Sequence, residues 1–233
     1  EAIIVAFRKH TLLPLDDFWA PDNDPSDPDG HGTHVAGIAA AAGNLKGGVG
    51  VNPQAKIMPL RAGDEDGLFP FGAIEEAFSY AVDHGARVVN ASFGGSVSSP
   101  GMEAIITANP QTLFVVAAGN HATDHESGET SRIYPCDIPA PNIICVAASD
   151  YNDGLAGFSD YGHPSVDLAA PGKAILSTIP DQSDPAAGGV DDYDYFDGTS
   201  MAAPFAAGAA SLIWSAYPTL ATSQDKTLLD KNL

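Results

Sequence analysis

Short apolar runs alternate along the chain with longer segments in which small and apolar residues recur at helical spacing. Runs that are apolar throughout are typical of strands buried on both faces of a sheet. The predicted strands are Lys56 to Leu60, Arg87 to Ser92, Thr112 to Ala118, Ile143 to Ala148, Val166 to Ala169 and Ala174 to Thr178. The predicted helices are His31 to about Gly43, Gly72 to His84, Thr199 to Ala216 and a final one beginning near Leu220.

The alternation of strands and helices predicts an α/β fold with three layers, in which helices cover both faces of a mostly parallel central sheet. The segment Thr199 to Ala216 is nearly all apolar, which indicates a central helix buried on every side. Asp181 to Asp197 is rich in Asp and Gly and is expected to be an irregular surface loop.

Composition limits the partners of this chain. Its 233 residues suffice for one large domain, residues 1–233, and no second domain is indicated. The net charge of −20 predicts repulsion from phosphate backbones and anionic membranes, so neither nucleic acid nor a membrane is an expected partner. No apolar run approaches the roughly 20 residues that a membrane-spanning helix needs, so a soluble protein is expected.

Two polar residues stand where a glycine-bearing turn meets an Ala-rich helix. Ser200 follows Gly198 and Thr199, and His31 lies between Gly30 and Gly32. A serine at such a position is often only a helix N-cap. A serine hydroxyl that acts as a nucleophile needs an imidazole to take its proton, and the pairing of the two junctions therefore predicts Ser200 as nucleophile and His31 as its base.

A third candidate follows the apolar run Phe114 to Ala118, which ends in Gly119 and Asn120. Asn is a common turn residue. Its side-chain amide is also suited to stabilising the negative charge that develops on a carbonyl oxygen during acyl transfer. Asn120 is therefore the expected oxyanion donor.

These segments together resemble the subtilisin-like serine proteases, the subtilase family, in the order His, Asn, Ser. The resemblance rests on six blocks and covers nearly the whole chain. The blocks are Gly30 to Gly37, Ile57 to Leu60, Val89 to Gly95, Ala117 to Asn120, Ala169 to Gly172 and Gly198 to Pro204. It implies a serine endopeptidase with His31 as general base, Ser200 as nucleophile, and Asn120 with the Ser200 N–H as oxyanion site. It implies no catalytic cofactor.

The sequence departs from the family pattern at the aspartate that orients the histidine. Members carry it in an Asp-Ser/Thr-Gly turn after the first core strand, whereas the strand-like run Ala2 to Phe7 leads into Arg8-Lys9-His10. Asp16 and Asp17 are weak substitutes because they lie close to His31 in sequence. The favoured explanation is a domain truncated at both ends; a substituted aspartate and a loss of activity are the alternatives.

The resemblance also implies how substrate is held. An extended peptide would pair with two strand edges, and small residues would line the pocket for a bulky hydrophobic side chain before the cut. The residues expected at the first edge are Ser92, Phe93 and Gly94, those at the second are Gly67, Leu68 and Phe69, and those at the pocket are Ala117, Ala118 and Gly119. Polypeptides are the expected partners, with a propeptide or protein inhibitor as regulator.

Metal ligands and a disulfide are the remaining expectations. Asp22, Asn23, Asp24, Asp27 and Asp29 offer the oxygens that calcium prefers, and the loop from Gly43 to Gly48 resembles a family loop that often holds a structural calcium ion, although Lys46 counts against it. A solvated acidic loop is the favoured interpretation of either segment taken alone. Cys136 and Cys145 flank a Pro-containing loop, so they are either bridged or, in a reducing compartment, buried thiols. A secreted or extracellular location is expected.

Two other functions compete with the endopeptidase. The first is an inactive relative that still binds peptides without a working triad. The second is a metal hydrolase using His31 and His34, which fails because no carboxylate accompanies them at ligand spacing. His34 is expected to pack against the sheet instead.

Overall fold

A computed structural model describes residues 3–8, 16–18, 27, 29–63, 69–180 and 193–232. In this part of the chain the main sheet has seven strands in the order β2-β3-β1-β4-β5-β6-β7. The strands are β1 (Ile3–Arg8), β2 (Asp16–Asp17), β3 (Lys56–Arg61), β4 (Val88–Ala91), β5 (Leu113–Ala117), β6 (Ile143–Ser149) and β7 (Leu168–Pro171). A separate antiparallel pair consists of β8 (Ile175–Thr178) and β9 (Tyr193–Phe196).

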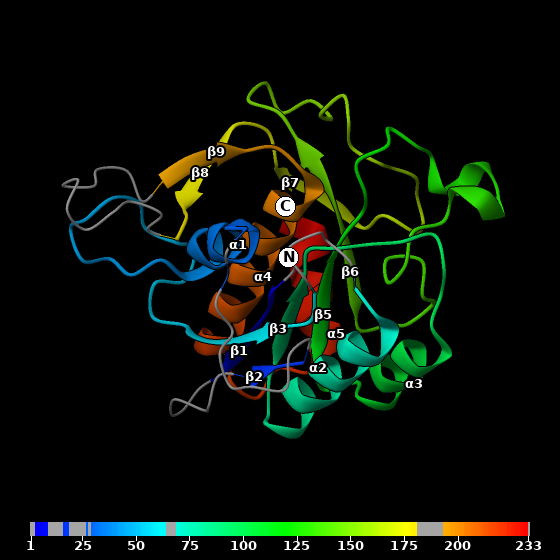
Figure 1. The fold of residues 1–233 in the computed structure, drawn as a ribbon, viewed down its shortest axis with the longest axis horizontal. Coiled ribbons are helices and arrows are strands. Elements are labelled where there is room, and N and C mark those ends of the chain that lie inside the picture. Colours follow the sequence, from blue (N-terminus) through cyan, green and yellow to red (C-terminus); the bar gives the residue numbers. More distant parts are fainter. Residues whose placement is uncertain are drawn as a thin grey trace.

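Five helices surround this sheet (Figure 1). They are α1 (His31–Ala40), α2 (Phe71–Asp83), α3 (Pro100–Ala108), α4 (Thr199–Ala216) and α5 (Thr222–Asn232). Two 3-10 turns, η1 (His125–Ser127) and η2 (Glu129–Ser131), follow β5. None of the described helices combines the length and the hydropathy that crossing a membrane requires.

Two apolar cores explain why the central strands are continuously hydrophobic. Along β5, Leu113, Val115 and Ala117 face a core shared with α1, α4 and α5. The alternate residues Phe114 and Val116 face a second core shared with α2 and α3. Because successive strand residues point to opposite faces, both faces of the strand must be apolar. The predicted three-layer α/β architecture is therefore confirmed.

The first strand runs in an unexpected direction. β1 lies between β3 and β4 and is antiparallel to both, whereas β4, β5, β6 and β7 are mutually parallel. An antiparallel strand forms hydrogen bonds with both neighbouring strands, as a parallel strand would. The position between β3 and β4 can therefore hold a strand of either direction.

Two further elements differ from the sequence-based expectation. The prediction of a surface loop up to Asp197 is wrong at its end, because Tyr193–Phe196 pairs with β8; residues 181–192 lie outside the described residues. The helix α3 was not predicted, although Ser99 precedes it, accepts a hydrogen bond from the N–H of Met102 at 3.3 Å, and is followed by Pro100. Ser at the N-cap with Pro at the first helical position is a helix-start signal.

Candidate active site

Ser200 is the second residue of α4, and its backbone is held from outside the helix. Pro204 stands four residues later and has no N–H to donate to the Ser200 carbonyl. The hydroxyl of Ser92, just after β4, donates to that carbonyl at 2.8 Å instead. The Ser200 hydroxyl in turn donates to the Ser92 carbonyl at 3.1 Å. The nucleophile candidate is thus tied to the carboxyl end of a central strand.

His31 is the first residue of α1. The turn before it needs glycine, because Gly30 has φ +89° and a Cβ there would approach Pro180 to 3.1 Å. The Asp27 carboxylate accepts hydrogen bonds from the N–H groups of Gly30 at 3.1 Å and Thr33 at 2.6 Å. These bonds satisfy free donors of the helix end and fix the position of His31.

The imidazole of His31 is set up as a base. Burial lowers the pKa of His31, and the nearby Asp29 and Asp27 carboxylates oppose this shift only in part. The ring is therefore neutral near pH 7 and can accept a proton. Its Nδ1 is buried and has no hydrogen-bond partner in the part of the chain that the structure describes. This nitrogen is where an orienting carboxylate would bind.

Asn120 lies just after β5, and its hydrogen bonds fix which way its side-chain amide points. Its Oδ1 accepts the backbone N–H of Thr199 at 2.8 Å and the Thr199 hydroxyl at 3.0 Å. A backbone N–H can only donate, so the oxygen must face Thr199 and the Nδ2 group is left on the other side, beside Gly198. Asn120 therefore presents a donor next to the Ser200 turn.

One cavity of about 510 Å³ brings these groups together. It is lined by His31, Asn120, Tyr195, Phe196, Asp197, Ser200 and Met201. All three sequence-predicted catalytic residues are in this set. The contribution of β9 was not predicted from the sequence, and the available signal was its run of aromatic residues, which favours a strand.

The two expected substrate edges meet through aromatic side chains. Phe69 and Phe93 stack with ring centroids 5.4 Å apart and planes at 16°. Within the described residues, the backbone groups of Phe93 and Gly94 have no hydrogen-bond partner. Ser92 is buried and directs its hydroxyl to Ser200. Gly67 and Leu68 lie outside the described residues.

The three small residues before Asn120 occupy different environments. Ala117 is buried in the core beneath α4, and Ala118 is buried in the core of the opposite face. Gly119 is half-buried, and its N–H donates to the Thr199 hydroxyl oxygen at 3.1 Å. None of the three lines the cavity that holds Ser200. Their role in a specificity pocket stays a prediction.

Asp16 and Asp17 form the edge strand β2, which pairs with β3. β3 and β1 separate them from β4. The backbone position of the two aspartates therefore argues against either of them as the orienting carboxylate.

The expected metal ligands do not assemble a calcium site in the described residues. Asp22, Asn23 and Asp24 lie outside them, and Asp27 already accepts three hydrogen bonds at the start of α1. In the loop from Gly43 to Gly48, the Asn44 side-chain oxygen accepts the N–H of Lys46, which also brings a cation. The described residues therefore do not show a calcium site at either segment.

His34 packs as expected. It is fully buried, its ring stacks on Phe196 with centroids 4.3 Å apart, and its Nε2 lies 3.0 Å from the Ile175 carbonyl oxygen. Burial lowers the pKa of His34. His34 packs against the β8–β9 pair, and its contacts give no support to a metal hydrolase that uses His31 and His34 as ligands.

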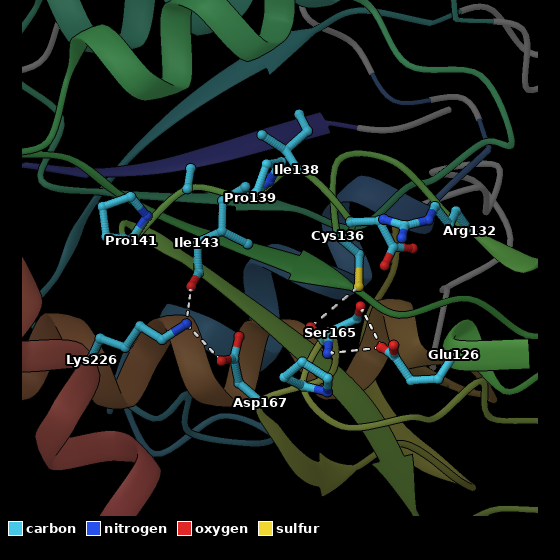
Figure 2. A pocket seen from close by; sticks show the side chains of 13 residues that line it. Glu126, Arg132, Cys136, Ile138, Pro139, Pro141, Ile143, Ser165, Asp167 and Lys226 are labelled. Carbon is cyan, nitrogen blue, oxygen red and sulfur yellow. Dashed lines mark hydrogen bonds and ion pairs between the residues drawn. The ribbon is translucent and has the colours of Figure 1, made fainter. Parts of the chain in front are cut away.

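Cys136 and Cys145 are bridged by a disulfide, which resolves the alternative left open by the sequence. Beside it lies a second cavity, of about 550 Å³ (Figure 2). Lys226 donates there to the Ile143 carbonyl at 2.5 Å and to Asp167 at 2.6 Å, and Glu126 accepts the Ser165 hydroxyl. Lys226 and Asp167 are paired with each other, Glu126 is bonded to Ser165, and no predicted catalytic residue lines this cavity.

Comparisons with known proteins agree with this geometry. The profile of the subtilase family matches residues 11–233. Thermitase from Thermoactinomyces vulgaris is 39% identical over 202 residues, covering 85% of this chain and 66% of thermitase. Subtilisin DY from Bacillus licheniformis is 36% identical over 213 residues, covering 91% of this chain and 73% of that protein.

Solved structures show the same relationship. A cold-adapted subtilisin-like serine proteinase superimposes with a TM-score of 0.77 at 29% identity, covering 94% of this chain and 73% of that one. The chain spans 46% of a thermophilic serine proteinase from Bacillus sp. strain AK1, to which it is 40% identical. The match of the family profile to nearly the whole chain and the identity to subtilisin DY lead to one conclusion: this chain belongs to the subtilase family.

Proposed function

We propose that this protein is a serine endopeptidase that hydrolyses peptide bonds through an acyl-enzyme. The observation that carries the proposal is the convergence of His31, Asn120 and Ser200 on one cavity from three separate elements. The nucleophile and the base both lie at helix N-termini, where free N–H groups and the helix dipole favour negative charge.

In the proposed reaction, Ser200, His31 and Asn120 take part both in forming the acyl-enzyme and in its hydrolysis. The Ser200 Oγ attacks the scissile carbonyl carbon while His31 takes the hydroxyl proton, and the new oxyanion accepts hydrogen bonds from Asn120 Nδ2 and the Ser200 N–H. The C–N bond then breaks as His31 returns the proton to the leaving amine. A water molecule repeats the sequence on the acyl-enzyme and releases the second product.

Substrate would lie extended between residues 92–94 and 67–69. The backbone groups of Phe93 and Gly94, which have no hydrogen-bond partner among the described residues, support this, because an added strand bonds to an edge through its main chain. The stacked Phe69 and Phe93 rings place an apolar surface between the two segments. We propose a broad preference for bulky hydrophobic residues before the cut, with Ala117 to Gly119 forming the pocket.

An inactive, peptide-binding protein is the alternative. The observation that favours it is the buried Nδ1 of His31, for which no carboxylate partner is present among the described residues. Loss of the orienting carboxylate lowers turnover by about 10⁴ in a serine protease, while the oxyanion site alone preserves part of the rate. Both the endopeptidase and the inactive alternative would bind peptides, but only the endopeptidase would cleave them at a substantial rate.

The buried disulfide supports a secreted or extracellular location, because such bonds persist in oxidising compartments. Polypeptide substrates are the proposed partners, with a propeptide or protein inhibitor in the same groove. No cofactor takes part in the proposed chemistry. A structural calcium ion is not supported by the described residues.

The experiment is a panel of chromogenic peptides that differ only in the residue before the cut, assayed with the protein and its Ser200→Ala variant. The endopeptidase predicts cleavage fastest after large apolar residues and none above background in Ser200→Ala, which still binds peptide. Peptide binding without cleavage by the unaltered protein would support the inactive alternative. Equal cleavage by Ser200→Ala would refute the proposed nucleophile.

A further inference from the structure

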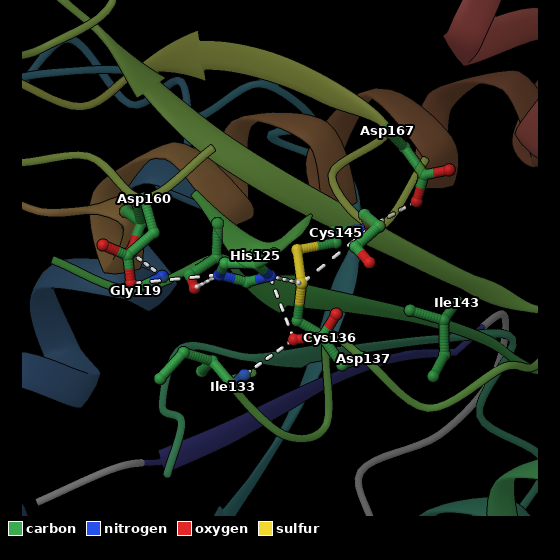
Figure 3. The surroundings of a disulfide bond; sticks show 12 residues. Gly119, His125, Ile133, Cys136, Asp137, Ile143, Cys145, Asp160 and Asp167 are labelled. Carbon is green, nitrogen blue, oxygen red and sulfur yellow. Dashed lines mark hydrogen bonds and ion pairs between the residues drawn. A yellow bond between two sulfur atoms is a disulfide. The ribbon is translucent and has the colours of Figure 1, made fainter. Parts of the chain in front are cut away.

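His125 is buried beside the residues that lead from the end of β5 to Asn120. His125 is 2% exposed, and its Nε2 lies 3.0 Å from the Ala118 carbonyl oxygen. Its Nδ1 lies 3.0 Å from Asp137 Oδ2 (Figure 3). A carbonyl oxygen accepts hydrogen bonds only, and so does an ionised carboxylate, so both ring nitrogens must donate. The geometry therefore requires an imidazolium at this position.

The charges around His125 agree with this assignment. Burial acts to lower the pKa of His125, but the hydrogen bond and charge of Asp137 and the charge of Asp160 outweigh it and raise the pKa above its ordinary value. Asp137 follows the Tyr134–Pro135 turn and also accepts the Ile133 N–H at 2.6 Å. Asp160 Oδ2 lies 3.9 Å from His125 Nε2.

Asp160 holds the other side of the same turn. It is fully buried, and its Oδ1 accepts the N–H groups of His121 at 2.7 Å and Thr123 at 2.9 Å. Its own N–H donates to the Gly119 carbonyl at 2.9 Å. Gly119 has φ +118°, and a Cβ there would lie 2.1 Å from Asp160 Oδ2, so the carboxylate packs directly against the glycine.

These contacts fix consecutive peptide groups around Asn120. His125 holds the Ala118 carbonyl, Asp160 holds the Gly119 carbonyl, and Asp160 also holds the N–H that follows Asn120. Asn120 itself is exposed at the cavity, so it draws its position from this backbone and from Thr199. An oxyanion donor contributes only if it is held in place before the reaction.

We infer that His125 and Asp160 are positioning residues that hold Asn120 where the oxyanion forms, with Asp137 keeping His125 charged. This inference rests on the proposed endopeptidase function. Besides Asp137 and Asp160, the groups near this cluster in the described residues include the Ser165 side chain beside Asp137, the His121 ring, 3.4 Å from Asp160 Oδ2, and the disulfide sulfur of Cys136, 3.6 Å from His125 Nδ1. When His125 loses its proton as the pH rises past its pKa, one of its two ring hydrogen bonds, to Ala118 or to Asp137, is lost, and Asn120 loses support.

The first test measures the rate at which a peptidyl phosphonate labels Ser200, and separately the affinity for a non-cleavable peptide. The variants are His125→Gln and Asp160→Asn, with Asp83→Asn on the exposed end of α2 as the matched charge control. We expect labelling about 10- to 100-fold slower in both variants, with peptide affinity nearly unchanged, because a small displacement of Asn120 affects the transition state most.

Labelling of the unaltered protein should also slow as the pH rises past the pKa of His125, and His125→Gln should not show this pH-dependent slowing. Folded variants that label at the normal rate would overturn the inference.

The second test needs neither activity nor a variant. Nitrogen-15 NMR of the unaltered protein should show both His125 ring nitrogens protonated at about pH 7. The Asn120 side-chain amide signals should shift with the same apparent pKa as His125. A neutral His125, or Asn120 signals that ignore its titration, would overturn the inference. If Ser200 never reacts but these signals are coupled, the endopeptidase proposal fails while the positioning of Asn120 by His125 is upheld.

Discussion

Ser92 and Ser200 exchange hydrogen bonds in both directions, each hydroxyl donating to the other residue's carbonyl, at 2.8 Å from Ser92 and 3.1 Å from Ser200. The pair compensates for Pro204, which cannot donate to the Ser200 carbonyl within α4. Asn90 supports it from β4, because its Nδ2 donates to the Ser92 hydroxyl oxygen at 2.9 Å. The start of α4 is thus anchored to the end of β4 by this pair of hydrogen bonds.

Replacing Ser92 with alanine should therefore destabilise the protein and slow Ser200 chemistry together. The half-buried carbonyl of Ser200 loses its donor, which costs about 1 kcal/mol of unfolding free energy. Urea unfolding measures the loss, and phosphonate labelling measures the reactivity. Ser96→Ala, at an exposed position four residues along, is the matched control. Equal stability of Ser92→Ala and Ser96→Ala would show that the bond to Ser200 contributes nothing.

Replacing Asn120 with alanine should slow acyl transfer and leave peptide binding intact, because in the proposed reaction the Nδ2 group bonds to the oxyanion that develops during acyl transfer. Removal of one such donor in a subtilisin lowers turnover by about 10²- to 10³-fold, and we expect a loss of that order. The comparison of turnover with KM on one chromogenic peptide separates the two effects. A rise in KM with unchanged turnover would place Asn120 in substrate binding instead.

Asp225 should make the protein less stable as pH rises. Its side chain is 5% exposed, burial raises its pKa to about 6 with partial opposition from Arg87, and its Oδ1 has no partner within the described residues. The folded state then binds more protons than the unfolded state between about pH 4 and 6, so unfolding free energy falls across that window by up to about 3 kcal/mol.

Asp225→Asn should remove this dependence and stabilise the protein at about pH 7 relative to the unaltered chain. Chemical unfolding at several pH values measures both effects. Glu103→Gln, at an exposed position on α3, is the control for loss of one surface carboxylate. A variant with the same pH profile as the unaltered protein would show that Asp225 is not the group responsible.

Removing the disulfide should lower stability without moving the catalytic groups. The bridge joins cysteines that are nine positions apart in the sequence, which predicts a loss of about 2–3 kcal/mol in Cys136→Ala/Cys145→Ala by the chain-entropy argument. Unfolding of the unaltered protein with and without a reductant should show the same difference. An unchanged midpoint would mean that the bridge adds no constraint beyond the packing around it.

The sequence predicted the parallel core and the three catalytic candidates because both depend on local patterns. Continuous apolar runs such as Phe114 to Ala118 identify strands buried on two faces, and glycine turns before helices identify the positions of His31 and Ser200. The side-chain orientation of Asn120 could not be predicted, since it depends on Thr199, which is distant in sequence and adjacent in space.

The direction of β1 and the buried His125 cluster were beyond sequence reasoning for the same reason. The direction of β1 depends on which strands it pairs with, and its apolar pattern is the same in either direction. His125, Asp137 and Asp160 come from three separate loops, and nothing in their spacing shows that they meet. The pairing of β9 with β8 was concealed by the acidic residues around it.

The most direct test of the account is mass spectrometric mapping of a fluorophosphonate adduct on the folded protein and its His31→Ala variant. The account predicts one adduct, on Ser200, that a competing peptide suppresses and that His31→Ala reduces by several orders of magnitude. Absence of an adduct on the folded protein, or equal labelling without His31, would contradict the claim that these two helix starts form one reactive site.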